Sequence, residues 1–289
     1  MSSSQKCVST EVKDTSLSSV TRSTSISSQQ LTANMSEHLY IDSARVDAES
    51  LEPFSRGLAP ERREVLAPLL TFLREWWSEE EGVTVQTSGS TGTPKRLQLT
   101  KLAMRRSGLR SNRYFQIQAG ERLLLAMDLR YIGAKMMVVR ALLAGAELIV
   151  VQPSSHPLAT LSVAPQFVSL VPLQLHHTLE EPAERELLSR AEQLIIGGGA
   201  IHPTVEAQLS ALPVAAFATY GMTETISHVA LRRLNGSHAS SLFYPLEGVH
   251  LTQGAEGETS LRIACFTPKV RVSRPMTSLS YTPMVALPS

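Results

Sequence analysis

The sequence has little cysteine: only Cys7 and Cys265 occur among 289 residues, near opposite ends of the chain. It contains no CxxC pair and no Cys/His spacing of the kind that holds zinc, so neither a zinc site nor a disulfide framework is expected. Such sparing use of cysteine is typical of a reducing compartment, and we expect a cytoplasmic protein.

The sequence also lacks an excess of charge and a long apolar run. The formal net charge is +1 with 18% charged residues, which argues against nucleic acid or an anionic membrane as the obligatory partner. The longest apolar region, MMVVRALLAGAELIVV, is interrupted by Arg140 and Glu147, so no membrane insertion is expected. A small molecule is therefore the expected partner.

Residues 1–34 form an arm rich in Ser and Thr, with few apolar residues and no periodicity. Such a segment cannot bury enough surface to offset the entropy of ordering, so it is expected to be disordered. It lacks the apolar core of a signal peptide, and Glu11 and Asp14 weaken a transit-peptide interpretation. Met35 is an alternative start of the protein, in which case the arm is an upstream extension.

Residues 35–261 alternate between strand-like and helix-like segments. PERREVLAPLLTFLREWW and AKMMVVRALLAG have helical spacing of apolar residues, whereas RLLLAM, AELIVV, FVSLV, EQLIIGG and VAAFATY are short strand-like runs. This order predicts an α/β domain with a mostly parallel sheet and helices on both faces. Ligands of such sheets bind at the carboxyl ends of the strands.

Residues 87–95, TSGSTGTPK, combine glycines, hydroxyls and a lysine between two strand-like segments, VTVQT and RLQLT. Glycines allow close backbone approach, hydroxyls donate hydrogen bonds, and Lys95 supplies a cation, which suits a polyphosphate. Pro94 precedes the lysine and a strand follows it, so this is not a Walker A loop. The alternative is a Ser/Gly hairpin turn without a ligand.

The order of residues in TSGSTGTPK resembles the phosphate-binding signature of the adenylate-forming superfamily, and TYGMTET at 219–225 resembles its second core motif. The resemblance implies that Tyr220 lies against adenine, that Thr223 meets phosphate and that Glu224 holds Mg²⁺, a metal that prefers hard oxygen ligands. It also implies ATP contacts for Thr87, Ser88, Gly89, Ser90, Thr91, Gly92, Thr93, Lys95 and Gly221. Taken alone, YGMTET is equally compatible with a strand-to-helix turn capped by a threonine.

IIGGGAIHP at 195–203 lies between these two motifs and places three glycines after an apolar strand. It resembles the part of the superfamily's site that lines adenine and the acyl substrate, which implies ligand contacts for Gly197, Gly198 and Gly199. The alternative is a flexible turn between a strand and a helix.

YIGAKMM, VSLVPLQL and YGMTETISHVALRRLNG resemble the o-succinylbenzoate–CoA ligase group of the superfamily, although Leu173 stands where many members have threonine. The resemblance covers residues 60–255 and implies that Ser227 and His228 lie near an aromatic acid. A partly buried structural role for His228 is the alternative.

The implied activity is ATP-dependent formation of an acyl-adenylate followed by a coenzyme A thioester, as in menaquinone biosynthesis. ATP, Mg²⁺ and coenzyme A are the implied cofactor and co-substrates, and Lys95, Thr91, Thr223 and Glu224 are the implied catalytic residues. The alternatives are a synthetase for another carboxylic acid and a nucleotide-binding fragment without catalysis.

Two features of the superfamily are absent as the chain is written. No aspartate follows Asp128 to bind the ribose, and the only lysine after Lys135 is Lys269, in a context unlike the catalytic lysine loop. We therefore expect the large N-terminal domain of the adenylate-forming fold without its C-terminal domain. Residues 262–289 are either a proline-rich tail or a non-native end, and exposed apolar surface is expected to favour a homo-oligomer.

Overall fold

The computed structural model describes residues 37–87, 96–253, 259–263 and 270–272. The chain divides into two compact units, residues 1–35 and 36–289, and every described residue belongs to the second unit. The expected arm at 1–34, residues 88–95 and most of the segment 262–289 therefore lie outside the described residues.

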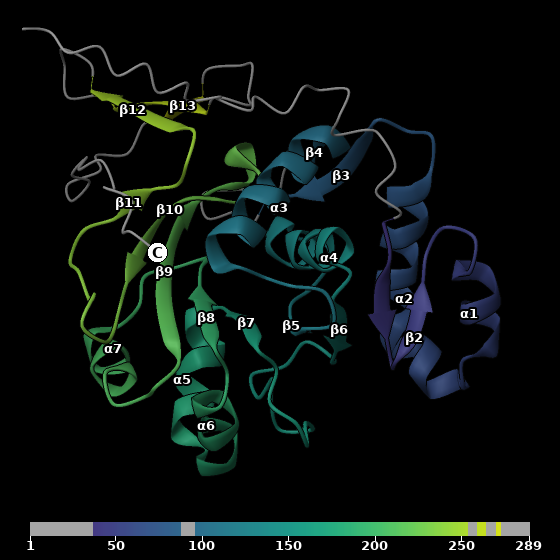
Figure 1. Cartoon of the computed structure of the whole chain (residues 1–289), viewed down its shortest axis with the longest axis horizontal. Helices are drawn as coiled ribbons and strands as arrows, with labels where there is room; N and C mark the ends of the chain where they lie inside the picture. Colours follow the sequence, from purple (N-terminus) through teal and green to yellow (C-terminus); the bar gives the residue numbers. More distant parts are fainter. Residues whose placement is uncertain (1–36, 88–95, 254–258, 264–269, 273–289) are drawn as a thin grey trace, which may run out of the picture. The chain divides into compact units, whose positions relative to one another are not determined.

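A nine-stranded sheet is the centre of this unit, with the strand order β11-β10-β9-β8-β7-β5-β6-β1-β2. The strands from β9 to β1 are parallel to their neighbours, whereas β2, β10 and β11 add antiparallel edges (Figure 1). The strands are β1 Leu39–Ile41, β2 Ala44–Val46, β5 Arg122–Leu125, β6 Glu147–Val150, β7 Phe167–Leu170, β8 Gln193–Ile196, β9 Ala215–Gly221, β10 His228–Arg233 and β11 Tyr244–Pro245.

Helices cover both faces of the sheet because successive strand residues point to opposite sides. Leu123 and Leu125 of β5 pack in one core with α2, α3 and α4, whereas Leu124 packs in a second core with α5, α6 and α7 (Figure 1). The mostly parallel α/β fold predicted from the sequence is thus confirmed. The helices are α1 Leu51–Gly57, α2 Pro60–Trp77, α3 Lys101–Phe115, α4 Ile132–Ala144, α5 Pro172–Glu180, α6 Pro182–Ser189 and α7 Pro203–Leu209.

Helix α4 is buried on all sides, since every residue from 134 to 143 is buried. It ends at Gly145, whose φ of +64° is a left-handed conformation that glycine adopts without steric cost. The helix is mostly apolar, yet Lys135 and Arg140 are buried with it. Within the ranges that the structure describes, no helix combines the length and the apolar composition that a membrane crossing requires.

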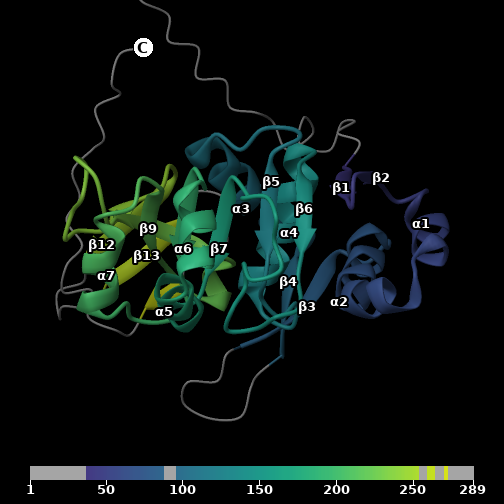
Figure 2. The same ribbon diagram turned by 90° about the horizontal axis from the view of Figure 1, so that it is seen from below.

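Two smaller sheets complete the unit. Strands β3 (Gly82–Gln86) and β4 (Arg96–Thr100) form an antiparallel ribbon beside α2 (Figure 2). Strands β12 (Val249–Gln253), β13 (Thr259–Ile263) and β14 (Val270–Val272) form a three-stranded sheet. β14 lies in the segment 262–289, for which the sequence predicts an irregular tail. A three-residue alternation such as VRV is too short to predict a strand.

Candidate active site

Two sequence segments with predicted ligand contacts lie at the carboxyl edge of the parallel strands, and the β3–β4 ribbon reaches the same edge. Residues 197–199 follow β8 and residues 222–227 follow β9, and these two strands are parallel neighbours (Figure 1). The β3–β4 ribbon reaches the same edge, since the Gln86 amide donates to the Arg130 carbonyl at 3.0 Å in the segment after β5. This edge is where open α/β sheets bind ligands.

The glycine run begins where β8 and β9 approach each other closely. A Cβ atom at Gly197 would lie 2.5 Å from Thr219 Oγ1, so no larger residue fits without movement. The Thr219 hydroxyl donates to the Ile196 carbonyl at 3.0 Å, which holds it against the glycine. Gly198 has a φ of +84°, which glycine adopts readily. Residues 197–199 therefore present backbone without side chains at this edge of the sheet. Their predicted contacts with a ligand stay a prediction.

The chain after β9 turns around a buried threonine, Thr225. Its hydroxyl accepts a hydrogen bond from the Met222 amide at 2.9 Å and lies 2.9 Å from the carbonyl oxygen of Ser227. The next residue, Ile226, is fully buried and has a φ of +69°, a strained conformation for a β-branched residue. A Cβ atom at Gly221 would lie 2.4 Å from the Ser227 carbonyl oxygen. These hydrogen bonds and close contacts together hold the turn in one conformation.

The three residues expected to contact nucleotide and metal lie at this turn. Tyr220 is half-buried, with its ring centroid 6.0 Å from that of Phe243. Thr223 begins a short 3₁₀ helix and Glu224 is exposed beside it. In the part of the chain that the structure describes, no three His, Cys, Asp or Glu residues are grouped to hold a metal by themselves. One exposed carboxylate beside a hydroxyl fits Mg²⁺ shared with a polyphosphate and water.

Thr87 is the one predicted phosphate-loop residue that is described, and it follows β3 directly, half-buried. The strands predicted on each side of the loop are confirmed, and Gln86 pairs with Arg96 at the end of the ribbon next to the loop. Both interpretations of the loop, hairpin turn and phosphate site, stay open. The remaining predicted residues, Ser88, Gly89, Ser90, Thr91, Gly92, Thr93 and Lys95, lie outside the described residues.

Ser227 and His228 contact a buried arginine of α4 that sequence reasoning did not assign to the site. Arg140 donates from Nη2 to Ser227 Oγ at 3.0 Å and from Nε to Ser111 Oγ at 2.8 Å. The same Nη2 lies 3.4 Å from His228 Nδ1, and Ser111 Oγ lies 3.3 Å from His228 Nε2. We call Ser111, Arg140, Ser227 and His228 the buried cationic cluster. Arg140 is 2% exposed and His228 is 6% exposed.

The buried cationic cluster carries a positive charge without a neighbouring carboxylate among the described residues. Burial lowers the pKa of Arg140 to about 10. Burial, followed by the charges of Arg140 and Arg110, holds the pKa of His228 well below its usual range, so the imidazole is neutral near pH 7. Among the described residues, Arg140 contacts hydroxyls and an imidazole but forms no ion pair with a carboxylate. A buried cation without a counter-charge is costly, and an anionic ligand would supply the missing charge.

Sequence signals for the additional residues differ in strength. Arg140 is visible as the charge that interrupts an apolar run, which is a signal for a buried functional or paired group. Ser111 lies in a helix with mixed polarity, and nothing in its neighbourhood in the sequence distinguishes it from other serines. Thr225 lies inside the recognised motif, yet its role in fixing the turn depends on contacts with the backbone.

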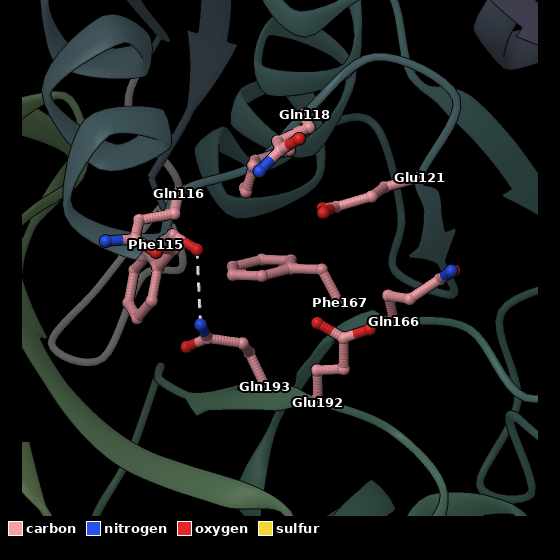
Figure 3. Close-up of a pocket in the computed structure, with 9 residues that line it drawn as sticks. Phe115, Gln116, Gln118, Glu121, Gln166, Phe167, Glu192 and Gln193 are labelled. Carbon is pink, nitrogen blue, oxygen red and sulfur yellow. Dashed lines mark hydrogen bonds between the residues drawn. The ribbon is translucent and has the colours of Figure 1, made fainter.

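A cavity of about 120 Å³ lies at the opposite edge of the sheet (Figure 3). Its lining includes Glu121, Gln166 and Glu192, which directly precede β5, β7 and β8 at their amino ends. Figure 3 shows the Gln193 amide bonded to the Phe115 carbonyl, at 3.1 Å, beside this cavity. None of the residues predicted from the sequence lines it, so it is separate from the candidate active site.

Comparisons with known proteins agree on one family. Residues 6–251 match the family described as AMP-binding enzyme. A curated relative from Mycobacterium tuberculosis, named "Probable 2-succinylbenzoate--CoA ligase", is 30% identical over 156 residues, which cover 51% of this chain and 40% of the relative.

Solved structures share the fold. An acyl-CoA synthetase (AMP-forming)/AMP-acid ligase II-like protein from Dyadobacter fermentans is 30% identical with a TM-score of 0.71, covering 77% of this chain and 64% of that protein. E. coli MenE with a bound analogue of OSB-AMS is 25% identical with a TM-score of 0.52, covering 65% of this chain and 40% of MenE. The chain thus spans less than half the length of the curated relative that it matches.

Proposed function

The chain belongs to the AMP-binding enzyme family, and we propose that it activates a carboxylic acid with ATP and transfers the acyl group to the thiol of coenzyme A. The observation that carries this proposal is that the glycine run and the TYGMTET turn follow neighbouring parallel strands at the carboxyl edge of the sheet, an edge that the β3–β4 ribbon also reaches through the hydrogen bond from Gln86 to Arg130. Every loop that follows a parallel strand lies at this edge, so the proposal depends also on what these loops carry: glycines without side chains, hydroxyls and the exposed Glu224 carboxylate. The convergence supports a single site for a nucleotide.

The proposed reaction has two steps. A carboxylate oxygen of the acid attacks the α-phosphorus of ATP, and the bond to pyrophosphate breaks. The thiol sulfur of coenzyme A then attacks the acyl carbon, and AMP leaves. Both steps depend mainly on alignment and on stabilisation of phosphate charge. We assign charge stabilisation to Lys95, Thr91 and Thr223, and Glu224 is the proposed ligand of Mg²⁺, which supplies positive charge next to the phosphates when bound.

For the acid we propose o-succinylbenzoate, which carries two carboxylates. One carboxylate is activated, and the other stays anionic and needs a partner. Arg140 is a buried cation without a carboxylate partner among the described residues, and Ser227 lies beside it as a half-buried hydrogen-bonding group. The names of the Mycobacterium relative and of E. coli MenE support the same acid. A second anionic group on the substrate therefore distinguishes this proposal from a synthetase for a simple monocarboxylic acid.

A nucleotide-binding fragment without catalysis is the second candidate. The matched segment covers 40% of the curated relative, so nucleotide binding without the reaction is the alternative outcome of the test. The division into an arm at 1–34, a partial adenylation domain at 35–261 and a distinct segment at 262–289 stays a prediction, as do the homo-oligomer and the cytoplasmic location.

The test is ATP–pyrophosphate exchange by the full chain with and without o-succinylbenzoate. Acid-dependent exchange is expected, and it should fall at least tenfold in Lys95→Ala and be partly retained in Lys95→Arg, which keeps the cation. ATP binding without exchange would instead favour the fragment. Unchanged ATP affinity in Lys95→Ala would overturn the phosphate-loop assignment.

A further inference from the structure

An ion pair between a buried lysine and a half-buried glutamate lies between α2, α4 and the β3–β4 ribbon. Lys135 is 6% exposed, and its Nζ lies 3.5 Å from Glu75 Oε2 and 4.5 Å from the ring centroid of Phe72. The other carboxylate oxygen, Glu75 Oε1, accepts a hydrogen bond from the Thr84 amide in the middle of β3 at 2.8 Å. One carboxylate therefore joins a helix, a buried lysine and a strand.

The β3–β4 ribbon depends on such contacts for its position. Among the described strands, β3 pairs with β4 alone, and a two-stranded ribbon is marginal by itself. At its other edge, the Thr84 amide is bonded by Glu75 and the Gln86 amide by the Arg130 carbonyl at 3.0 Å. Val83 and Val85 anchor the ribbon in the core through their side chains. Apolar packing tolerates small displacements along the strand, whereas the two amide hydrogen bonds fix its register against α2 and the segment before α4.

Burying the charged side chain of Lys135 within an apolar helix costs free energy. Burial lowers the pKa of Lys135, and the Glu75 carboxylate opposes that effect. An apolar side chain of similar length would fill the same volume without the cost of burying a charge. The ammonium group does what an apolar chain cannot: it orients the Glu75 carboxylate, so that the second oxygen points at the Thr84 amide.

We propose that Glu75 and Lys135 are positioning residues for nucleotide binding, which act by holding β3 at a fixed height against α2 and α4. Thr87, the first residue of the proposed phosphate-binding segment, lies three residues beyond Thr84, so displacement of β3 reaches the nucleotide site directly. This inference rests on the proposed function. The two residues contact neither substrate, and we expect them to affect the binding of ATP but not the binding of the acid.

The first test compares Lys135→Met with Glu75→Gln in the full chain. The Gln side chain keeps an oxygen for the Thr84 amide but loses the ion pair, whereas Met keeps the volume of Lys135 but loses its charge. We expect each variant to raise the KM for ATP about tenfold while the KM for the acid changes less than twofold, and Lys135→Arg to recover part of the loss. Arg74→Met removes the neighbouring exposed ion pair with Glu52 and serves as the control, with no change in either KM.

A second measurement needs no activity. Hydrogen exchange of residues 82–86 in the nucleotide-free chain should be at least tenfold faster in Lys135→Met than in the wild type, whereas the strands of the large sheet keep their protection. Equal changes in both KM values, or unchanged exchange in residues 82–86, would overturn the inference. If the wild type does not turn over, the proposed function fails and the exchange result alone decides whether the pair positions β3.

Discussion

Arg140→Met separates the function of the buried cationic cluster from its contribution to folding. The fall in the pKa of Arg140 to about 10 corresponds to about 3 kcal/mol against the charged form in the folded state. The substitution relieves that cost and keeps an unbranched apolar stem. It also removes the hydrogen bonds to Ser111 and Ser227, which contribute about 1.5 kcal/mol each because the donor is charged. The two effects nearly cancel, so we expect the free energy of unfolding to change by less than about 1.5 kcal/mol.

The effect on the acid should be much larger. Removing one partner of a buried charged contact costs about 2 kcal/mol or more, which corresponds to at least a 30-fold rise in the KM for o-succinylbenzoate. The KM for ATP should stay within threefold of the wild type. Urea unfolding of the free protein measures the stability, and acid-dependent pyrophosphate exchange measures both KM values.

Arg113→Met is the matched control, because Arg113 lies on α3 with a side chain that is 62% exposed and paired with Glu247. It should change neither stability nor KM by a measurable amount. If Arg140→Met destabilises the protein by more than about 3 kcal/mol and leaves the KM for the acid unchanged, Arg140 is a structural residue and the reasoning is wrong.

Two further predictions concern stability. His228 stays neutral in the folded protein, whereas in the unfolded chain it binds a proton near pH 6.5. The free energy of unfolding should therefore fall as the pH drops below that value, by up to about 1.4 kcal/mol per pH unit. Urea unfolding of His228→Asn should show a weaker pH dependence, and an identical slope would contradict the burial argument. Gly197→Ala should destabilise by about 1–3 kcal/mol, since the new Cβ meets Thr219 Oγ1, and adding Thr219→Ala should recover part of the loss. Strict additivity of these two substitutions in urea unfolding would show that the contact is not the cause.

Long periodic segments made most of the fold predictable. α2 and α4 repeat apolar residues over three or more turns, and the parallel strands β5 to β9 are short apolar runs followed by turn signals. β1, β2 and β14 have three residues each, so their alternation is too brief to separate from chance. Their strand conformation depends on neighbours that only the folded chain provides.

Some residues of the candidate site could be predicted from the sequence and others could not. Residues 219–225 and 197–199 belong to contiguous motifs, so their roles could be proposed from the order of residues alone. Arg140 contacts Ser227 across 87 positions of sequence, and Ser111 meets His228 across 117. Those contacts arise where α3 and α4 pack against the start of β10, which is a tertiary event without a local signal. The same holds for Glu75 and Thr84, which come from a helix and a strand.

We propose that this chain makes an acyl-adenylate at the carboxyl edge of its sheet. The most direct measurement is mass spectrometry of the nucleotides released after mixing stoichiometric amounts of the full chain with ATP, Mg²⁺ and o-succinylbenzoate, with benzoate as the monocarboxylic comparison. We predict a species with the mass of o-succinylbenzoyl-adenylate, formed with o-succinylbenzoate, absent with benzoate and strongly reduced in Arg140→Met. ATP that stays intact with both acids, although it binds to the chain, would contradict the claim.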